Sequence, residues 1–319
     1  MYPAEFEYFS PATVNEALDL LARHGDDAKI LAGGQSLLPM MKLRIASPRY
    51  LVDVNGIEAL AGLRREGDRL VIGALCRHAD IAASSLVREH LPIMWDAANL
   101  TADVQVRNRG TVAGSLAHAD PAGDWPAALL ALDTMVTIAG PDGIRTTPLG
   151  EFIVDAYTTQ LGASEMVTDV SVGIPPEPNG GAYVKFEKRA GDFAVASVGV
   201  QIELDEHEHC RSVAITLGAL GPTPLRAGSA EALLRGSALL RGSSVAGSAS
   251  DSAPDSALNG ASAERLVEAE RLVRDAADPF ADTRGSVAYK RHLAGVLFRR
   301  AFAVALDRAH GRTVATLHP

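Results

Sequence analysis

Apolar and polar positions along the chain recur with two periods, which predicts both helices and strands. A helical period over residues 13–24 predicts a first helix that ends at Gly25, and an apolar run at 28–31 predicts a strand that leads directly into Gly33 and Gly34. Further strands are predicted at residues 50–54, 69–74, 135–138, 144–146 and 166–174. Further helices are predicted at residues 78–83, 85–98 and 126–132. The first half of the chain is therefore expected to mix α and β structure.

The clearest interruption of the pattern lies at residues 175–181, where three prolines precede a pair of glycines. Because such residues do not continue a helix or a central strand, we place a domain boundary there. Beyond it, the pattern predicts antiparallel strands at 182–187, 195–204 and 212–220, followed by helices at 263–277 and 286–309. The expected fold class is α+β, with domains at residues 1–176 and 177–319.

One stretch of the second domain has low complexity. From Gly236 to Ser262, 18 of 27 residues are Gly, Ser or Ala. Such a composition buries too little apolar surface to offset the entropy lost on ordering. We expect residues 236–262 to form a flexible surface insertion.

Charge and cysteine content exclude several classes of protein. The formal net charge is −9 and no long run of Lys or Arg occurs, so the basic surface of a nucleic-acid-binding protein is missing. Cys76 and Cys210 lie far apart without a CxxC spacing, which argues against a disulfide framework and a local zinc or iron–sulfur site. The sequence lacks the features of a signal peptide and any apolar stretch long enough to span a membrane. We expect a cytoplasmic protein.

Two segments rich in small residues carry the candidate chemistry. In residues 31–39, adjacent glycines after a strand allow backbone N–H groups to approach an anion such as a pyrophosphate, although a plain tight turn explains them equally well. The segment does not match the GxGxxG pattern of a Rossmann site. In residues 108–115, small residues and hydroxyl groups suit a phosphate, and Asp124 follows as an acceptor for sugar hydroxyls. Two such loops in one domain are able to hold a dinucleotide from two sides.

These segments resemble a known family. Residues 32–44 (AGGQSLLPMMKLR) and 108–115 (NRGTVAGS) resemble the two FAD-binding motifs of the medium, flavin-bearing subunit of carbon monoxide dehydrogenase and related molybdenum hydroxylases, including the xanthine dehydrogenase FAD subunit. Residues 185–194 and 282–291 resemble the family's flavin-side segment and its C-terminal signature. The resemblance covers nearly the whole chain. It implies an FAD-binding domain of the PCMH type with two lobes, about 1–56 and 57–176, and a C-terminal domain of antiparallel sheet plus helices.

The resemblance also implies a function. The chain would bind FAD non-covalently and pass electrons from iron–sulfur clusters to an external acceptor, while a partner oxidises the organic substrate. The implied partners are a large molybdopterin-binding subunit and a small subunit with [2Fe-2S] clusters, arranged as a dimer of heterotrimers. No side chain of this chain needs to act as an acid, base or nucleophile, and no metal ligand is expected.

The resemblance also implies specific cofactor contacts. Residues 30–37 and 111–115 would hold the pyrophosphate, Asp124 would bind sugar or ribityl hydroxyls, and Lys185 would lie near the flavin. Thr101 and Val167 would be further contacts. Phe193 would cover the flavin ring, or would be a core aromatic residue. The full set is Ile30, Leu31, Ala32, Gly33, Gly34, Gln35, Ser36, Leu37, Thr101, Gly110, Thr111, Val112, Ala113, Gly114, Ser115, Asp124, Val167, Lys185 and Phe193.

Three positions depart from the family pattern. Ala113 and Ser115 stand where the family more often has Gly and Asn, and Gln35 stands where His or Thr is common. Because alanine requires a backbone angle compatible with its Cβ atom, the second loop is expected to approach the phosphate less closely.

Two alternatives remain at this point. A self-contained FAD-dependent oxidase or reductase would need polar groups over the flavin, and no such constellation is evident. A binding protein that has lost the cofactor is argued against by the intact Gly33, Gly34, Gly114 and Asp124. Neither the organic substrate nor the electron acceptor is encoded in a recognisable motif.

Overall fold

The structure is a computed structural model that describes residues 2–239 and 260–314. The chain forms two compact units, and each unit combines three chain segments. The first unit contains residues 1–84, 101–120 and 133–174, and the second contains residues 85–100, 121–132 and 175–319. Helices and strands alternate in the first unit, and an antiparallel sheet with helices forms the second, which confirms the predicted α+β class.

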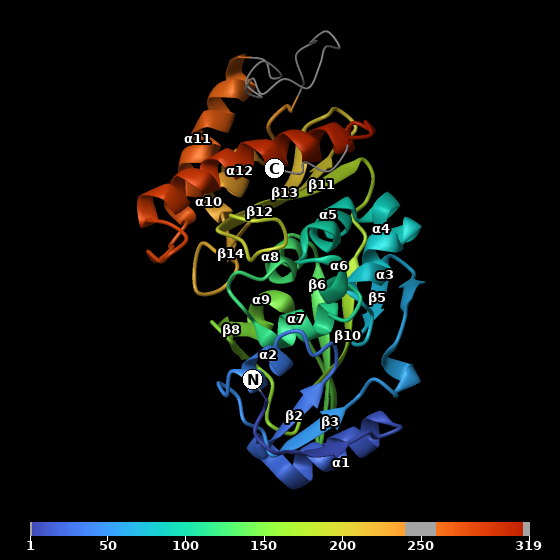
Figure 1. Cartoon of the computed structure of the whole chain (residues 1–319). Coiled ribbons are helices and arrows are strands. Elements are labelled where there is room, and N and C mark those ends of the chain that lie inside the picture. The colour runs from blue at the N-terminus through green and yellow to red at the C-terminus, as the bar shows by residue number, and fades with distance from the viewer. Residues whose placement is uncertain (1, 240–259, 315–319) are drawn as a thin grey trace. The chain divides into compact units, whose positions relative to one another are not determined.

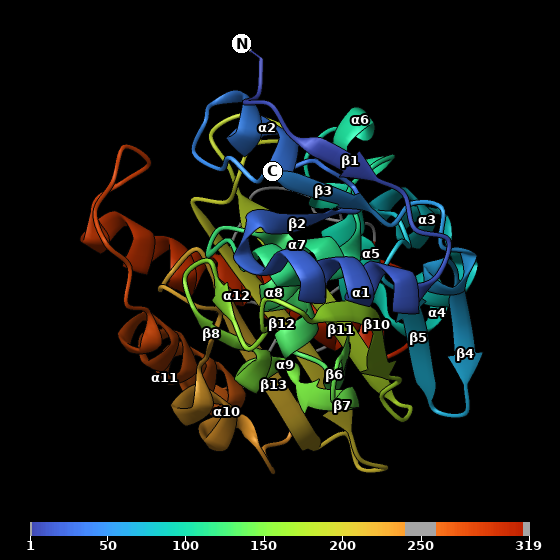
Figure 2. The same cartoon turned by 90° about the horizontal axis from the view of Figure 1, so that it is seen from below.

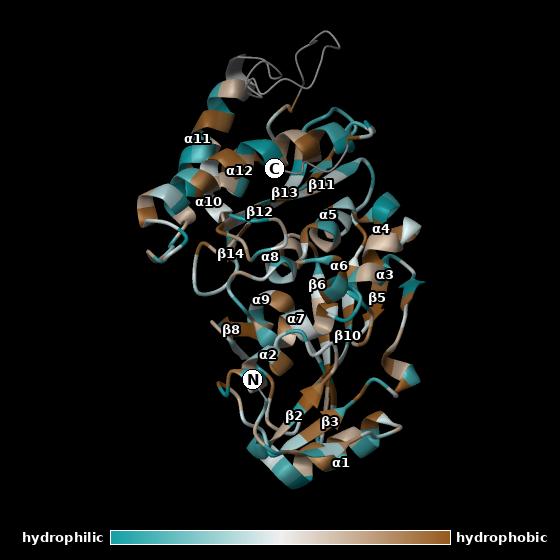
Figure 3. Cartoon of the chain, in the orientation of Figure 1, coloured by the Kyte–Doolittle hydropathy of each residue, from teal (hydrophilic) through white to brown (hydrophobic). Residues whose placement is uncertain are grey.

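A three-stranded parallel sheet lies at the N-terminal end of the first unit, with the order β1-β3-β2 (Figure 2). Its strands are β1 (Glu7–Phe9), β2 (Ala28–Leu31) and β3 (Tyr50–Asp53). Helix α1 (Val14–His24) packs against β2 and β3 because its apolar face is buried, as the predicted helical period requires. Figure 3 shows β2 as predominantly hydrophobic, whereas α1 alternates between hydrophobic and hydrophilic residues.

A five-stranded antiparallel sheet forms the rest of the first unit's framework, with the order β4-β5-β10-β6-β7. Its strands are β4 (Leu63–Glu66), β5 (Arg69–Gly73), β6 (Thr134–Gly140), β7 (Gly143–Pro148) and β10 (Met166–Gly173). The turn between β6 and β7 confirms the predicted hairpin. Short elements connect the two sheets' strands: α2 (Leu37–Lys42), α3 (His78–Ala83), α6 (Val104–Arg107), α7 (Val112–His118), α9 (Leu149–Phe152), β8 (Ile153–Asp155), β9 (Thr158–Thr159), and the 3₁₀ turns η1 (Gly25–Asp27) and η2 (Glu58–Leu60).

The second unit is built on a four-stranded antiparallel sheet with the order β11-β12-β13-β14. Its strands are β11 (Asn179–Phe186), β12 (Ala196–Leu204), β13 (Cys210–Gly218) and β14 (Leu225–Arg226). Figure 1 shows α12 (Val287–Ala309) on one face of this sheet, and α5 (Pro92–Leu100) and α8 (Asp124–Leu130) on the other. Because both faces are covered, nearly every residue of β12 is buried. Helices α10 (Gly228–Leu234) and α11 (Gly260–Ala276) pack against each other, and α11 also packs against α12.

The strand predicted at residues 182–187 begins earlier than expected, at Asn179. Gly180 and Gly181 lie inside β11, which is an edge strand of its sheet. A Cβ atom on Gly180 would collide with the carbonyl oxygen of Ala305 in α12. Glycine is therefore required at this position by the close approach of a helix to a strand.

The predicted helix at residues 85–98 is two helices. α4 (Ser85–His90) ends before Pro92, which begins α5. Proline fits the first turn of a helix, where its missing N–H group has no intrahelical partner to bond. Residues 85–100 and 121–132 belong to the second unit, so the compact units differ from the linear limits 1–176 and 177–319 in these two segments.

The limits of the predicted insertion also need correction. Ser237 and Leu239 are buried, and the backbone N–H of Cys210 donates to the carbonyl of Ser237 at 2.9 Å. At the other side, α11 begins at Gly260. The rest of the predicted insertion, residues 240–259, lies outside the described residues.

Within residues 2–239 and 260–314, no helix combines the length and apolar character needed to cross a bilayer. Over the same residues, His, Cys, Asp and Glu side chains form no group of three or more that could hold a metal ion.

Candidate functional site

The first loop, residues 32–36, connects β2 to α2 and follows directly from Ile30 and Leu31 at the end of the strand. Gly34 has a φ of 73°, in the left-handed region that favours glycine. In the described part of the chain, the backbone N–H groups of Gly34, Gln35 and Ser36 donate to no protein acceptor. The loop therefore offers a row of backbone donors, which is the chemistry that binds an anion.

The second loop, residues 108–111, connects α6 to α7. Thr111 caps α7, and its Oγ1 atom accepts a hydrogen bond from the N–H of Gly114 at 3.0 Å. Residues 112–115, expected as loop, are therefore the first turn of a helix. Ala113 is buried in that turn, where alanine is fully compatible with the backbone, so the expected penalty for replacing glycine does not apply.

The two loops are in direct backbone contact. A Cβ atom on Gly33 would lie 2.5 Å from the carbonyl oxygen of Arg109 and 2.7 Å from the Cα atom of Gly110. A Cβ atom on Gly110 would in turn lie 2.7 Å from Nε2 of His78. Glycine is therefore needed at position 33 for close approach. The structure brings residues 30–37 and 110–115 together, as a two-sided pyrophosphate cradle requires.

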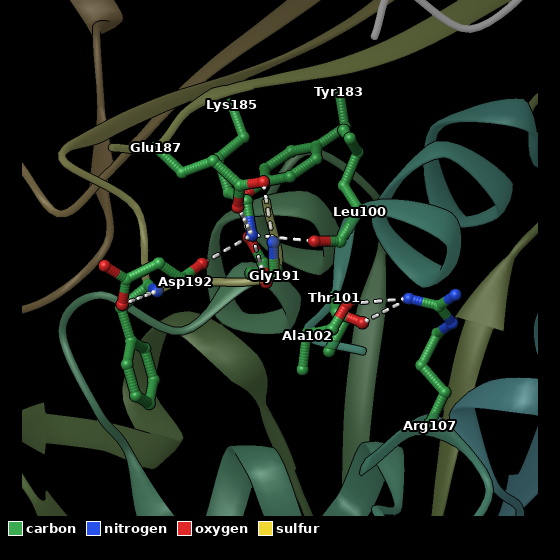
Figure 4. Close-up of polar contacts among 11 residues, drawn as sticks. Leu100, Thr101, Ala102, Arg107, Tyr183, Lys185, Glu187, Gly191 and Asp192 are labelled. Carbon is green, nitrogen blue, oxygen red and sulfur yellow. Dashed lines mark hydrogen bonds and ion pairs between the residues drawn. The ribbon is translucent and has the colours of Figure 1, made fainter. Parts of the chain in front are cut away.

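Two further candidate cofactor contacts of the first unit, Thr101 and Val167, lie outside the two loops. Thr101 follows α5, and the guanidinium group of Arg107 donates to its carbonyl oxygen at 3.0 Å and to that of Ala102 at 2.7 Å (Figure 4). Val167 is buried in β10, next to an irregularity in its pairing with β6. These contacts fix the backbone at Thr101 and leave Val167 as a packing residue of the sheet.

In the second unit, Lys185 lies at the centre of a buried polar cluster with Tyr183 and Glu187 (Figure 4), and Asp124 belongs to the same cluster. The Lys185 Nζ atom is 3.3 Å from Oδ2 of Asp124 and 2.9 Å from Oε2 of Glu187. It also donates to the carbonyl oxygens of Leu100, at 2.7 Å, and Asp192, at 3.1 Å. The hydroxyl group of Tyr183 donates to Oδ1 of Asp124 at 2.9 Å.

The charges of this cluster do not balance, because one ammonium group faces two carboxylates. Burial raises the pKa of Asp124, while the charge of Lys185 acts in the opposite direction. Burial also raises the pKa of Tyr183 well above its usual value, which keeps the phenol a hydrogen-bond donor. Since an ammonium group has three protons and Lys185 faces four protein oxygen atoms, its side chain holds Asp124 and Asp192 in place rather than donating to a ligand.

Phe193 is 48 % exposed, so the alternative that it is a core aromatic residue is wrong. It lies in the loop between β11 and β12, whose backbone is held by two carboxylates. Glu187 accepts from the N–H of Gly191 at 2.9 Å, and Asp192 accepts from the N–H of Phe193 at 2.8 Å. The guanidinium carbon of Arg284 lies 5.8 Å from the centroid of the Phe193 ring. The loop presents an aromatic ring to the outside of its unit.

Sequence reasoning missed several residues that shape these two regions. Tyr183 and Glu187 flank Lys185 with the period of two that places side chains on one face of a strand, so the pattern contained a usable signal. Asn55 contacts the backbone of the first loop and Arg77 that of the second, and neither has such a signal because they lie in different connections.

Family models, sequence relatives and a solved structure all match this chain to the same family of flavin-binding subunits. Residues 4–176 match the family model described as the FAD binding domain in molybdopterin dehydrogenase, and residues 181–261 match the CO dehydrogenase flavoprotein C-terminal domain. The sequence is 38 % identical to the 6-hydroxypseudooxynicotine dehydrogenase complex subunit alpha of Paenarthrobacter nicotinovorans, over 97 % of each chain. It is 37 % identical to the carbon monoxide dehydrogenase medium chain of Hydrogenophaga pseudoflava, covering 97 % of this chain and 99 % of the relative. A solved structure of carbon monoxide dehydrogenase from that organism superposes with a TM-score of 0.86 at 38 % identity, over 97 % of this chain and 99 % of the other.

Proposed function

Since this chain belongs to the family of FAD-binding subunits of molybdopterin dehydrogenases, we propose that it holds FAD non-covalently, with the pyrophosphate between the first and second loops. The chain is an oxidoreductase subunit that serves a multi-subunit molybdenum hydroxylase. The observation that carries the proposed binding mode is the backbone contact of Gly33 with Arg109 and Gly110.

The donor set of the first unit fits the phosphate groups of FAD. The N–H groups of Gly34, Gln35, Ser36 and Ala113 donate to no acceptor among the described residues, and all four belong to the cradle. Charge-assisted hydrogen bonds to phosphate oxygens would satisfy them. The remaining residues of 30–37 and 110–115 shape the walls of the same site, whereas the contacts of Thr101 and Val167 do not give either a direct role in holding the phosphates.

The second unit supplies groups suited to the sugar and ring portions of the cofactor. Asp124 accepts two hydrogen bonds from the protein, which leaves lone pairs for a ribose or ribityl hydroxyl group. Lys185 fixes the Asp124 carboxylate and the Asp192 carbonyl, and Phe193 screens the flavin ring from water. Bound FAD supplies the exchange between one-electron and two-electron carriers, so no side chain of this chain acts as an acid, base or nucleophile.

Substrate oxidation takes place in partner subunits under this proposal. Cys76 and Cys210 are both buried, and burial raises the pKa of each thiol to about 12, so neither is a ready iron–sulfur ligand. We therefore assign the [2Fe-2S] clusters to a small subunit and the molybdopterin to a large subunit. We also propose that the complex is cytoplasmic and forms a dimer of heterotrimers. We assign the FAD-binding domain to residues 1–176, in two lobes at about 1–56 and 57–176, and the C-terminal domain to residues 177–319.

The test is to express the chain alone and together with candidate large and small subunits. Alone, it should be yellow, should release free FAD on denaturation, and should turn over no organic substrate. In the complex, aldehydes, purines, N-heterocycles or carbon monoxide should reduce the flavin only when the iron–sulfur subunit is present. Rapid anaerobic bleaching of the isolated chain by any of these compounds would support a self-contained oxidase instead.

A further inference from the structure

Arg77 contacts both the second loop and a residue that reaches the first loop. Its side chain donates to the carbonyl oxygen of Arg109 at 2.7 Å and to Oδ1 of Asn55 at 2.6 Å. Its backbone forms an isolated antiparallel bridge with Thr111, and its N–H donates to Oδ2 of Asp80 at 2.8 Å. Both the main chain and the side chain of Arg77 are therefore fixed beside the second loop.

Asn55 completes the connection to the first loop. Its Nδ2 atom donates to the carbonyl oxygen of Ala32 at 2.9 Å, while its Oδ1 atom accepts from Arg77. The amide is oriented by Asp53, whose Oδ1 atom accepts from both the backbone and the side chain of Asn55, at 2.9 and 2.6 Å. A continuous path of hydrogen bonds thus runs from Ala32 through Asn55 and Arg77 to Arg109.

This path bridges the point where the loops meet at Gly33. Loops without ladder hydrogen bonds lose conformational entropy when they close around a ligand, and a bridge already present in the free protein reduces that loss. The bridge is also cationic. Burial lowers the pKa of Arg77, and the charge of Arg109 lowers it further, so two guanidinium groups lie within electrostatic range of each other beside the cradle.

We propose that Arg77 is a positioning residue that, with Asn55, holds the two loops at the separation needed for a pyrophosphate. The proposal rests on the proposed binding of FAD by these loops. Arg77 acts through the Arg109 carbonyl and the Asn55 amide rather than by contact with the ligand. Its replacement should weaken the binding of ligands that contain a pyrophosphate, and only secondarily affect the stability of the fold.

The test uses the full chain freed of flavin, with FAD titrated by fluorescence and ADP used as a competitor that lacks the flavin ring. Arg77→Met should weaken both FAD and ADP by about tenfold or more, because a charge-assisted bridge to two acceptors is lost. Arg77→Lys should recover part of the affinity, since it keeps the charge and one hydrogen bond. Arg64→Met, an exposed arginine on β4 of the same unit, is the matched control and should bind as the wild type does.

A double variant tests whether the path acts as one element. Asn55→Ala alone should also weaken FAD, and Arg77→Met combined with Asn55→Ala should be little weaker than Arg77→Met alone. Wild-type affinity in Arg77→Met would overturn the proposal. The proposal would also be overturned if Arg77→Lys did not restore affinity and the loss of affinity paralleled a lower unfolding midpoint of the flavin-free protein. If the wild-type chain binds neither FAD nor ADP, the proposed function fails as well, which distinguishes the two results.

Discussion

Arg308 forms a two-point ion pair with Asp96, although 212 residues separate them in the sequence. Its two terminal nitrogen atoms lie 2.6 and 3.0 Å from the two carboxylate oxygens. Arg308 also donates to the carbonyl oxygen of Gly181 at 2.6 Å, and Asp96 accepts from the N–H of Tyr183 at 3.1 Å. The end of α12 is therefore joined to α5 and β11 within the second unit.

Arg308→Met should lower the free energy of unfolding by about 3–5 kcal/mol, because it leaves the buried Asp96 carboxylate without its cation. Chemical denaturation followed by circular dichroism measures the change. Arg300→Met, an exposed position on the same helix, is the control and should change stability by less than about 0.5 kcal/mol. Equal effects of the two substitutions would contradict the importance of the ion pair.

Gly34→Asp should abolish FAD binding. It places a side chain on a backbone with a φ of 73°, close to Leu31 and Leu38, and adds a carboxylate to the anion cradle. Gly67→Asp is the matched control, because Gly67 has a φ of 62° in an exposed turn with no atom within 4 Å of its Cβ position. The flavin content of both purified variants is measured by release of FAD. Stoichiometric FAD in Gly34→Asp would show that the first loop does not hold the phosphates.

Lys185→Met should destabilise the chain by about 3–5 kcal/mol, since the carboxylates of Asp124 and Glu187 then share a buried site without a cation. Adding Glu187→Gln to this variant should restore part of the stability, because it removes one of the two negative charges. Lys188→Met changes an exposed lysine three residues later and serves as the control. Urea unfolding compares the four proteins, and a double variant less stable than Lys185→Met would refute this account of the charges.

Acid should weaken the first unit through His78. Burial, together with the charges of Arg107 and Arg77, lowers the pKa of His78 to about 4. An unfolded chain binds a proton on this histidine below about pH 6.5, whereas the folded chain stays neutral there until about pH 4. The free energy of unfolding should therefore fall by up to about 3 kcal/mol as the pH drops through this window.

His78→Gln should lack this part of the pH dependence, whereas His207→Gln, in the exposed turn between β12 and β13, should retain it. The comparison uses the slope of unfolding free energy against pH, so any uniform loss of stability in a variant does not affect it. Parallel slopes for the wild type and His78→Gln would contradict the assignment.

Much of the secondary structure could be predicted, because it depends on local signals. The strand Ala28–Leu31 and the helix His78–Ala83 have the predicted bounds. The helix Val112–His118 was missed because its small residues resemble a loop, and only the Thr111 hydroxyl bonded to Gly114 reveals the cap. Strand β11 was predicted to begin at residue 182, but it begins at Asn179, because the glycine at position 180 is required by the close packing of α12, which no local pattern contains.

Some residues of the candidate site could be predicted from the sequence, and others could not. The glycine loops could be found because their residue types carry the chemistry themselves. Arg77 and Asn55 could not, because their role depends on contacts with backbone carbonyl groups of segments distant in sequence. The resemblance placed Lys185 beside the flavin, but the number of oxygen atoms around its ammonium group is visible only after folding.

The composition of the second unit from three chain segments determines when it can form on the ribosome. Helices α5 and α8 are synthesised well before the strands that they cover. Until β11 to β13 emerge, apolar side chains such as Ile93 and Leu129, both buried in the finished protein, have no sheet to pack against. A nascent chain that pauses near residue 176 would expose both helices to chaperones or to neighbouring chains.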